Sequence, residues 1–235
     1  DACIPTGGSD TITFSVNGTI TMGIGGVGED AGLTGDYDIT ESLTIIGNGA
    51  ANTIISGNSV DRVFHIFAGT VSLSEMTITN GNPGTGLSGG GVLVDGGAAA
   101  LSNVTVSSNT AAEGGGVRVN AATMTISGST IKSNTATGSG GGIFADTGST
   151  LTIYSGTIGG SSSTDKNTAI NGGGIYTKGN TLINNSAVIQ NNEVTNNGGG
   201  VYVFSGGFKA ENTSSIKGNK ATTFGGGVYI IGGTV

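Results

Sequence analysis

Three consecutive glycines return along this chain at nearly constant spacing. They begin at Gly89, Gly114, Gly140, Gly172, Gly198 and Gly225, so the intervals are 25, 26, 32, 26 and 27 residues. Sequence repeats of about 20 to 50 residues are typical of solenoids, in which each repeat forms one coil that packs on the next. The longest interval contains the polar stretch GGSSSTDK, Gly159 to Lys166, which we expect to be a loop outside the core.

The residues that follow each glycine triplet alternate with a period of two, which indicates a β-strand with one buried face. The first and third residues are expected to face inward: Val92/Val94, Val117/Val119, Ile143/Ala145, Ile175/Thr177, Val201/Val203 and Val228/Ile230. The residues between them are expected to face outward: Leu93, Arg118, Phe144, Tyr176, Tyr202 and Tyr229. The two-residue turns that hairpins favour are missing between successive strands, so each strand should pair in parallel with its counterpart one coil later.

These patterns predict an all-β chain that forms a single right-handed parallel β-helix of about nine coils. One domain is expected over residues 1–235. Its coils are less regular over 1–69, with a loop at 23–38, and regular over 70–235. The 48 glycines suit the stacked corners of such a solenoid, where bulky side chains on neighbouring coils would collide. The short strand-like stretches that begin at Asp10, Gly18, Ser42, Asn52 and Arg62 are counted among the coils.

One asparagine recurs five or six residues before the glycines in the later repeats. These residues are Asn109, Asn134, Asn167, Asn192 and Asn219. A side-chain amide can donate and accept hydrogen bonds at once, so stacked asparagines can satisfy one another. We predict a structural asparagine ladder at these positions.

The stretches DTITFSVNGTITM, SLTIIGNGAANTIISGN and GTVSLSEMTITNGN, followed by the GGG repeats, resemble bacterial secreted β-helix proteins that have a Cys-Ser-Leu-Arg-Glu-Ala type amino-terminal element. The later repeats also resemble those of chlamydial polymorphic outer membrane proteins. The chain lacks the Ser-Leu-Arg-Glu-Ala run after Cys3 and has GGG where the second group has Gly-Gly-Ala. The resemblance implies an extracellular or cell-surface protein, such as an adhesin or a structural part of the envelope.

Composition excludes several classes of partner. The formal net charge is −7 with only 8 lysines and arginines, which argues against nucleic-acid binding. The sequence has no apolar run of the length that a membrane span needs, so no membrane insertion is expected. Cys3 is the only cysteine, so it is expected to be a free thiol or to link two chains. No cofactor motif passes its context test, because GIGGVG at Gly23 has no helix pattern after it.

Enzyme activity is the minority interpretation, although a polysaccharide lyase or hydrolase remains an alternative. Asp95 and Asp146 occupy equivalent sites two coils apart with Asn120 between them, and Lys178 follows one coil later. His65 is expected to point outward from a strand without metal ligands beside it. The acidic residues Glu29, Asp30, Asp36, Asp38 and Glu41 are expected to lie in a solvated loop, with Ca²⁺ binding as the alternative.

Ice binding is a further alternative, since it would use flat arrays of threonine. The pairs Thr11/Thr13, Thr19/Thr21, Thr77/Thr79, Thr123/Thr125 and Thr150/Thr152 are suggestive. The next equivalents are taken as Thr181/Ile183 and Phe208/Ala210, at which the array breaks.

The outward column Phe144, Tyr176, Tyr202 and Tyr229 forms a possible surface-contact stripe for sugar rings or another chain, and the alternative is that it only stabilises the sheet. The sequence stops at VYIIGGTV without a charged or proline-bearing edge strand. We therefore predict an extracellular structural protein whose partners are copies of itself stacked end to end into a filament, with cell-surface glycans as possible further partners.

Overall fold

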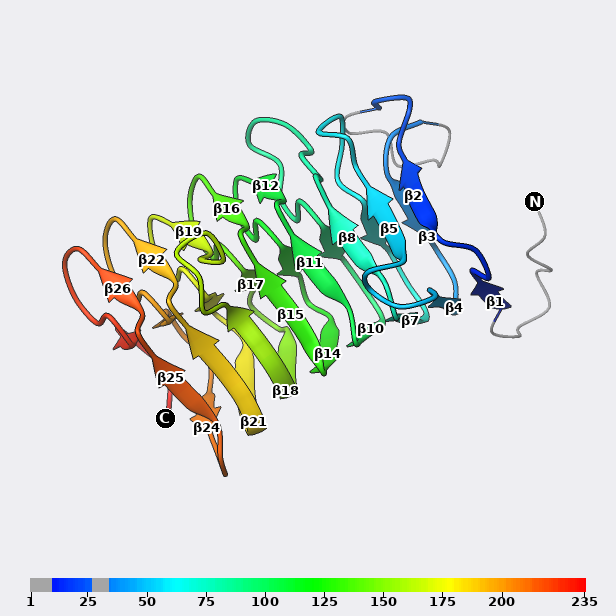
Figure 1. Cartoon of the computed structure of the whole chain (residues 1–235). Coiled ribbons are helices and arrows are strands. Elements are labelled where there is room, and N and C mark those ends of the chain that lie inside the picture. The colour runs from blue at the N-terminus through cyan, green and yellow to red at the C-terminus, as the bar shows by residue number, and fades with distance from the viewer. Residues whose placement is uncertain (1–9, 27–33) are drawn as a thin grey trace.

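The computed structural model describes residues 10–26 and 34–235, and these form 27 β-strands that stack into a rod. The strands lie across the rod, and the chain advances coil by coil from the amino-terminal to the carboxyl-terminal end (Figure 1). Every pair of neighbouring strands is parallel, and equivalent residues pair across coils, as Val92, Val117 and Ile143 show on three successive coils. The pairing of Thr150–Gly159 with Asn180–Gln190 has one register shift, between Ile153 and Ser155. The described part of the chain is therefore a parallel β-helix, and none of its residues forms a helix long and apolar enough to cross a membrane.

The strands belong to three sheets that surround the core. The largest, with fourteen strands, has two limbs. The first limb contains β1 (Asp10–Thr13), β4 (Leu43–Ile46), β7 (Thr70–Ser74), β10 (Ala98–Ser102), β14 (Thr123–Ser127) and β24 (Phe208–Ala210). The second limb contains β2 (Gly18–Thr21), β5 (Thr53–Ser56), β8 (Thr77–Thr79), β11 (Thr105–Ser107), β15 (Ser129–Lys132) and β25 (Ser215–Lys217). The strands β18 (Thr150–Gly159) and β21 (Asn180–Gln190) run through both limbs.

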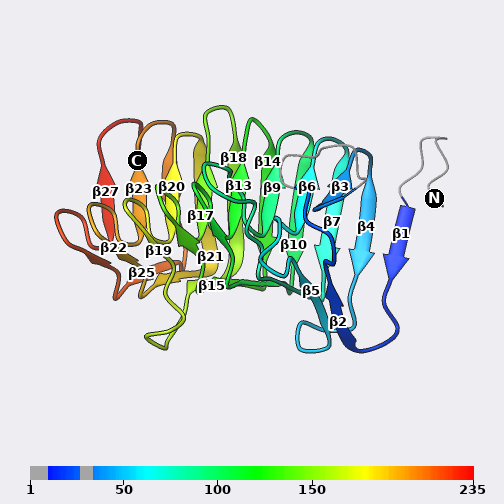
Figure 2. The same cartoon turned by 90° about the horizontal axis from the view of Figure 1, so that it is seen from above.

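The other two sheets complete each coil. The short sheet contains β12 (Thr110–Ala111), β16 (Thr135–Ala136), β19 (Thr168–Ala169), β22 (Glu193–Val194) and β26 (Lys220–Ala221). The eight-stranded sheet contains β3 (Tyr37–Ile39), β6 (Phe64–Ile66), β9 (Val92–Val94), β13 (Val117–Val119), β17 (Ile143–Ala145), β20 (Ile175–Thr177), β23 (Val201–Val203) and β27 (Val228–Ile230). Figure 2 shows these eight strands side by side along one flank of the rod.

The predicted number of coils was too high. The eight-stranded sheet receives one strand from each coil, so its eight strands correspond to about seven complete turns rather than nine. The excess arose because one coil contains two strands of the large sheet. The stretches that begin at Asp10 and Gly18, counted separately from sequence, form β1 and β2 on two limbs of one coil.

The predicted loop at 23–38 also ended too late. Tyr37 and Asp38 belong to β3, where they pair with Phe64 and His65 of β6. Asp38 lies at an outward position of this strand, and its polar side chain made the strand resemble a loop in the sequence. Residues 27–33 of this segment lie outside the described residues.

The core contains stacked aliphatic columns that extend along the rod. The inward residues predicted after each glycine triplet are fully buried as far as Val203, and the matching column from the second limb includes Ile78, Val106 and Ile131. Each of these side chains lies above an equivalent one, so the coils bury apolar area mainly against their neighbours. Such burial stabilises a chain by about 25 cal/mol per Å² of apolar surface.

The glycine triplets form a corner at which backbones of successive coils nearly touch. A methyl group at Gly141 would lie 2.5 Å from the carbonyl oxygen of Thr168 and 2.7 Å from that of Gly173. The first glycine of this triplet, Gly140, has φ of 70°, in the left-handed region that glycine favours. The triplet is therefore required by both the conformation and the close approach of the next coil.

The asparagine ladder is present as predicted. The Nδ2 group of Asn134 donates to Oδ1 of Asn167 at 3.0 Å, and Nδ2 of Asn167 donates to Oδ1 of Asn192 at 2.9 Å. Each amide also donates to a backbone carbonyl of the preceding coil, as Asn134 does to Val106 at 3.0 Å. Four of the five ladder residues are fully buried, and Asn219 is half-buried. These hydrogen bonds satisfy polar groups that would otherwise destabilise the corner.

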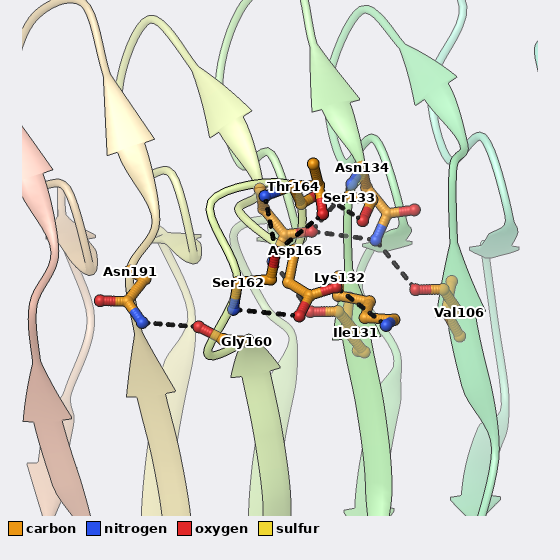
Figure 3. Close-up of polar contacts among 11 residues, drawn as sticks. Val106, Ile131, Lys132, Ser133, Asn134, Gly160, Ser162, Thr164, Asp165 and Asn191 are labelled. Carbon is orange, nitrogen blue, oxygen red and sulfur yellow. Dashed lines mark hydrogen bonds and ion pairs between the residues drawn. The ribbon is translucent and has the colours of Figure 1, made fainter.

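The polar stretch Gly159 to Lys166 begins at the end of β18, where Gly159 and Gly160 are buried, and its residues 161–164 form an exposed loop, as expected, that contacts neighbouring coils (Figure 3). Nζ of Lys132 lies 2.9 Å from Oδ1 of Asp165, and Oγ of Ser133 donates to the carbonyl oxygen of Thr164 at 2.8 Å. On the other side, Nδ2 of Asn191 donates to the carbonyl oxygen of Gly160 at 2.6 Å. The insertion therefore connects the coil before it to the coil after it.

Replacing the central ladder residue should destabilise the rod. Asn167→Ala leaves at least two buried groups without partners, at about 1–3 kcal/mol each, so the free energy of unfolding should fall by roughly 3 kcal/mol. Asn219→Ala is the matched control, because water can reach this half-buried position, and it should lose less than half as much. Denaturant unfolding followed by circular dichroism measures both. Equal losses in the two variants would contradict a stabilising role for the buried ladder.

Candidate functional site

The outer face of the eight-stranded sheet carries the side chains that were singled out as candidate functional residues. Strand register aligns its central column, from the amino-terminal to the carboxyl-terminal end, as Asp38, His65, Leu93, Arg118, Phe144, Tyr176, Tyr202 and Tyr229. The column changes from ionisable residues to aromatic ones along the rod. The predicted outward orientation is confirmed, because the residues on either side of this column in β6, β9, β13, β17 and β23 lie in the core.

The aromatic residues form a stack that is mostly buried, which corrects the prediction of a surface-contact stripe. Ring centroids lie 4.9 Å apart for Phe144 and Tyr176, and 4.8 Å apart for Tyr176 and Tyr202. Phe144 is 1% exposed, Tyr176 7% and Tyr202 8%, while Tyr229 is half-buried. Burial raises the pKa of Tyr176 to about 12. The rings face one another and their neighbours, so little of their surface remains for a sugar or another chain.

Arg118 links three coils on this face. Its Nη1 lies 2.7 Å from Oε2 of Glu113 and donates to Oγ of Ser88 at 2.8 Å, and its Nη2 lies 2.7 Å from Oδ2 of Asp146. Its guanidinium carbon also lies 5.2 Å from the ring centroid of Phe144. The arginine therefore joins the ionic part of the column to the aromatic stack through charge and cation–π contacts.

The second outward column places Asp95, Asn120, Asp146 and Lys178 on successive coils, as the sequence predicted. Nδ2 of Asn120 donates to Oδ1 of Asp95 at 3.1 Å, and Nζ of Lys178 lies 3.4 Å from Oδ1 of Asp146. The hydrogen bond with His65 lowers the pKa of Asp95. Burial raises the pKa of Asp146, but the Thr147 amide, Lys178 and Arg118 together outweigh it, so the net shift is downward. Both carboxyls are therefore held ionised at neutral pH.

A cluster of Asp36, Asp38 and His65 lies at the amino-terminal end of this face. One ligand atom of each residue lies within 4.8 Å of the others. Nε of Arg62 lies 2.8 Å from Oδ2 of Asp36, and Nε2 of His65 lies 2.9 Å from Oδ2 of Asp95. Among residues 10–26 and 34–235, these three form the group whose ligand atoms could share a metal ion.

This cluster corrects two expectations. His65 points outward as expected, but it is only 3% exposed and packs on Phe67, and carboxylates that could share a metal ion lie beside it. Asp36 is 6% exposed, so it does not lie in a solvated loop. Glu41 is exposed and outside the cluster. Glu29, Asp30 and Cys3 lie outside the described residues.

The threonine array is interrupted, as expected, but the equivalence taken for its last members was wrong. Thr150 and Thr152 pair with Asn180 and Leu182, whereas Thr181 faces inward and is 3% exposed. The sequence comparison was shifted by one residue, which moves a side chain to the other face of a strand. The longest threonine column lies on the other limb of the large sheet and contains Thr77, Thr105, Thr130 and Thr157.

The sequence reasoning missed the contacts of Arg118 and the cluster around His65. A signal was present for both. Asp38 precedes His65 by about one repeat period, and Arg118 precedes Asp146 by about one period plus two residues. The ladder residues Asn109, Asn134, Asn167, Asn192 and Asn219 lie at a different corner and take no part in this face.

Removing the arginine should change the ionisation of its neighbour. In Arg118→Gln, the pKa of Asp146 should rise toward its ordinary value of 3.8, because a nearby cation no longer stabilises the carboxylate. Carbon-13 NMR titration of the Asp146 carboxyl group measures the shift. Lys132→Gln is the control, since Lys132 pairs with Asp165 instead. An unchanged Asp146 pKa in Arg118→Gln would contradict the contact.

Comparison with known proteins identifies the kind of fold. A family model described as a right-handed β-helix region matches residues 63–235, which is more than two thirds of the chain. Searches of curated proteins and of solved structures give no match. The match covers the coils from β6 to β27, including most of the outer face described above. The chain belongs to the right-handed β-helix family.

Proposed function

We propose that this β-helix is a structural module of an extracellular or cell-surface protein. The observation that supports this proposal is that the polar and aromatic side chains of the outer face contact one another across coils. Arg118, Asp146 and Lys178 form ion pairs, and Phe144, Tyr176 and Tyr202 form a buried stack. Side chains that pair or stack with neighbouring coils stiffen the rod, and little of their surface remains to bind a substrate. The resemblance to secreted bacterial β-helix proteins supports the extracellular location.

Catalysis on polysaccharides fits this face less well. A glycoside hydrolase needs one carboxylic acid that stays protonated near neutral pH and a second carboxylate beside it. Asp95 and Asp146, the pair singled out from sequence, both have lowered pKa values and lie two coils apart. Among the described residues, the two cations nearest Asp146, Arg118 and Lys178, are both ion-paired, so neither is an available base for a lyase.

Self-association through the ends of the rod is part of the proposal. Core columns, glycine corners and the ladder repeat from coil to coil, so a coil of one copy would meet on another copy the same partners that it meets within its own rod. Ile230 of β27 lies in the same column as the fully buried Val203 but is 40% exposed, so its inward-facing side is accessible to such a copy. A second copy that stacks here would bury it and extend the sheets, as in a filament.

A charged residue introduced at Ile230 should prevent copies of the chain from stacking end to end. Sedimentation velocity and electron microscopy of the purified chain should show rods that lengthen with concentration. Ile230→Lys should abolish the lengthening, because a lysine would be buried at the junction. Ile170→Lys, at a position 45% exposed between β19 and β20, is the matched control and should assemble like the parent chain. Rods of constant length at all concentrations, or equal assembly of the two variants, would contradict the proposal.

Glycan binding is a second candidate, favoured by a shallow groove on the first limb of the large sheet. Its lining includes Thr150, Thr152, Asn180, Lys209 and Glu211. Hydroxyl, amide and charged groups on a flat strand surface can hydrogen-bond to sugar hydroxyls. This candidate requires no chemistry and is compatible with a structural role.

Binding to acidic polysaccharides should depend on the lysine of this groove. Lys209→Ala should weaken retention on an immobilised acidic polysaccharide at least several-fold, since Lys209, although it pairs with Glu211, is 69% exposed at its side chain and can contact carboxylates of the polymer as well. Lys217→Ala is the control, because Lys217 lies on the second limb, outside the groove. If the chain is not retained, or both variants bind alike, this groove is not a glycan site.

A further inference from the structure

The amino-terminal end of the eight-stranded sheet contains a buried group of ionisable residues that the structural role does not use. Asp38 of β3 lies opposite His65 of β6, and Asp36 lies two residues before Asp38. The side chains of Asp38 and His65 are 6% and 4% exposed, and that of Asp36 is 3% exposed. Potential ligand atoms of all three lie within 4.8 Å of one another.

The orientation of His65 is that of a metal ligand. Nε2 of His65 lies 2.9 Å from Oδ2 of Asp95, and with the ring proton assigned to Nε2 it donates to that carboxylate. Nδ1 then faces Oδ1 of Asp38 at 3.8 Å, which is longer than a hydrogen bond. Two atoms that share an ion at about 2.0–2.2 Å each lie about 3–4 Å apart. A histidine that binds a metal through one nitrogen commonly donates from the other to a carboxylate, and Asp95 supplies this second contact.

The local charge also favours a bound cation. Asp36, Asp38 and Asp61 place three carboxylates in this buried region, and the cation among the described residues beside them is Arg62. The Nε and Nη1 groups of Arg62 make no hydrogen bond within the described residues, so its contact with Asp36 is a charge contact without hydrogen-bond geometry. Carboxylates buried side by side are stabilised by a cation that lies among them.

We propose that Asp36, Asp38 and His65 bind a divalent transition-metal ion, for which Zn²⁺ is the best match. Zn²⁺ accepts imidazole nitrogen together with carboxylate oxygen, and three protein ligands leave a fourth position for water. Ca²⁺ fits less well, because it requires six to eight oxygen ligands. A metal here joins β3 to β6 and stabilises the two coils that contain them. This binding does not depend on the proposed structural role of the other coils.

The test uses the full chain with Cys3→Ser as background, so that the single thiol cannot bind the metal. After treatment with EDTA and its removal, titration with Zn²⁺ in competition with a chromophoric chelator should show one ion per chain. His65 is the only histidine. One equivalent of Zn²⁺ should therefore shift the single set of imidazole NMR signals, with the larger change at Nδ1. Unshifted imidazole signals, or a response to Ca²⁺ but not to Zn²⁺, would overturn the proposal.

Variants separate the ligands from the rest of the cluster. His65→Gln and Asp38→Asn should weaken Zn²⁺ binding more than 100-fold. Asp95→Asn should weaken it about 10- to 100-fold, because Asp95 orients His65 and does not itself bind the ion. Asp165→Asn removes a carboxylate of the insertion loop and should leave binding unchanged. Equal affinity in Asp38→Asn and Asp165→Asn would contradict the assignment. If a ligand variant does not fold, the thermal midpoint of the background chain decides, because it must rise with Zn²⁺ and fall again with EDTA.

Discussion

In-register stacking of equivalent residues on successive coils is the constraint on which the rest of this structure depends. Each position must accommodate a copy of its own side-chain type directly above and below it. Aliphatic columns satisfy this requirement by packing, and asparagines satisfy it because one amide both donates and accepts. At the glycine corner, the backbone of Gly141 lies so close to that of the next coil that a methyl group would contact carbonyl oxygens. The repeat in the sequence is the direct result of this geometry.

The outer face of the eight-stranded sheet follows the same constraint with different chemistry at its two ends. Aromatic residues can stack on themselves, so Phe144, Tyr176 and Tyr202 form a continuous column. Like charges repel one another, so they cannot stack in this way. In the ionic part of the face, cations therefore lie between anions, as Arg118 lies between Glu113 and Asp146. The cluster around His65 is the exception, because its buried carboxylates outnumber the described cations beside them. The close approach of two of these carboxylates to the imidazole makes the cluster a candidate for a bound ion.

Local patterns in the sequence predicted much of the fold and part of the candidate site. The inward columns, the ladder, the exposed insertion and the order Asp95, Asn120, Asp146 and Lys178 are all confirmed. The errors concern quantities that depend on how strands share a coil. Two strands of one coil were counted as two coils, and Thr181 was aligned with Thr150 although it pairs with Leu151. A shift of one residue has no local signature in a threonine-rich strand, yet it reverses the face of every side chain.

By itself, the sequence determined that this chain coils into stacked parallel strands, because glycine, asparagine and alternating apolar residues at one period are compatible with few other folds. Only the tertiary structure decided which distant side chains meet. Burial of Tyr176, the ion pairs of Arg118 and the approach of Asp36 to His65 depend on distances between coils and on the side chains that cover the sheet. These distances follow from the packing of the whole rod, so no single repeat of the sequence specifies them.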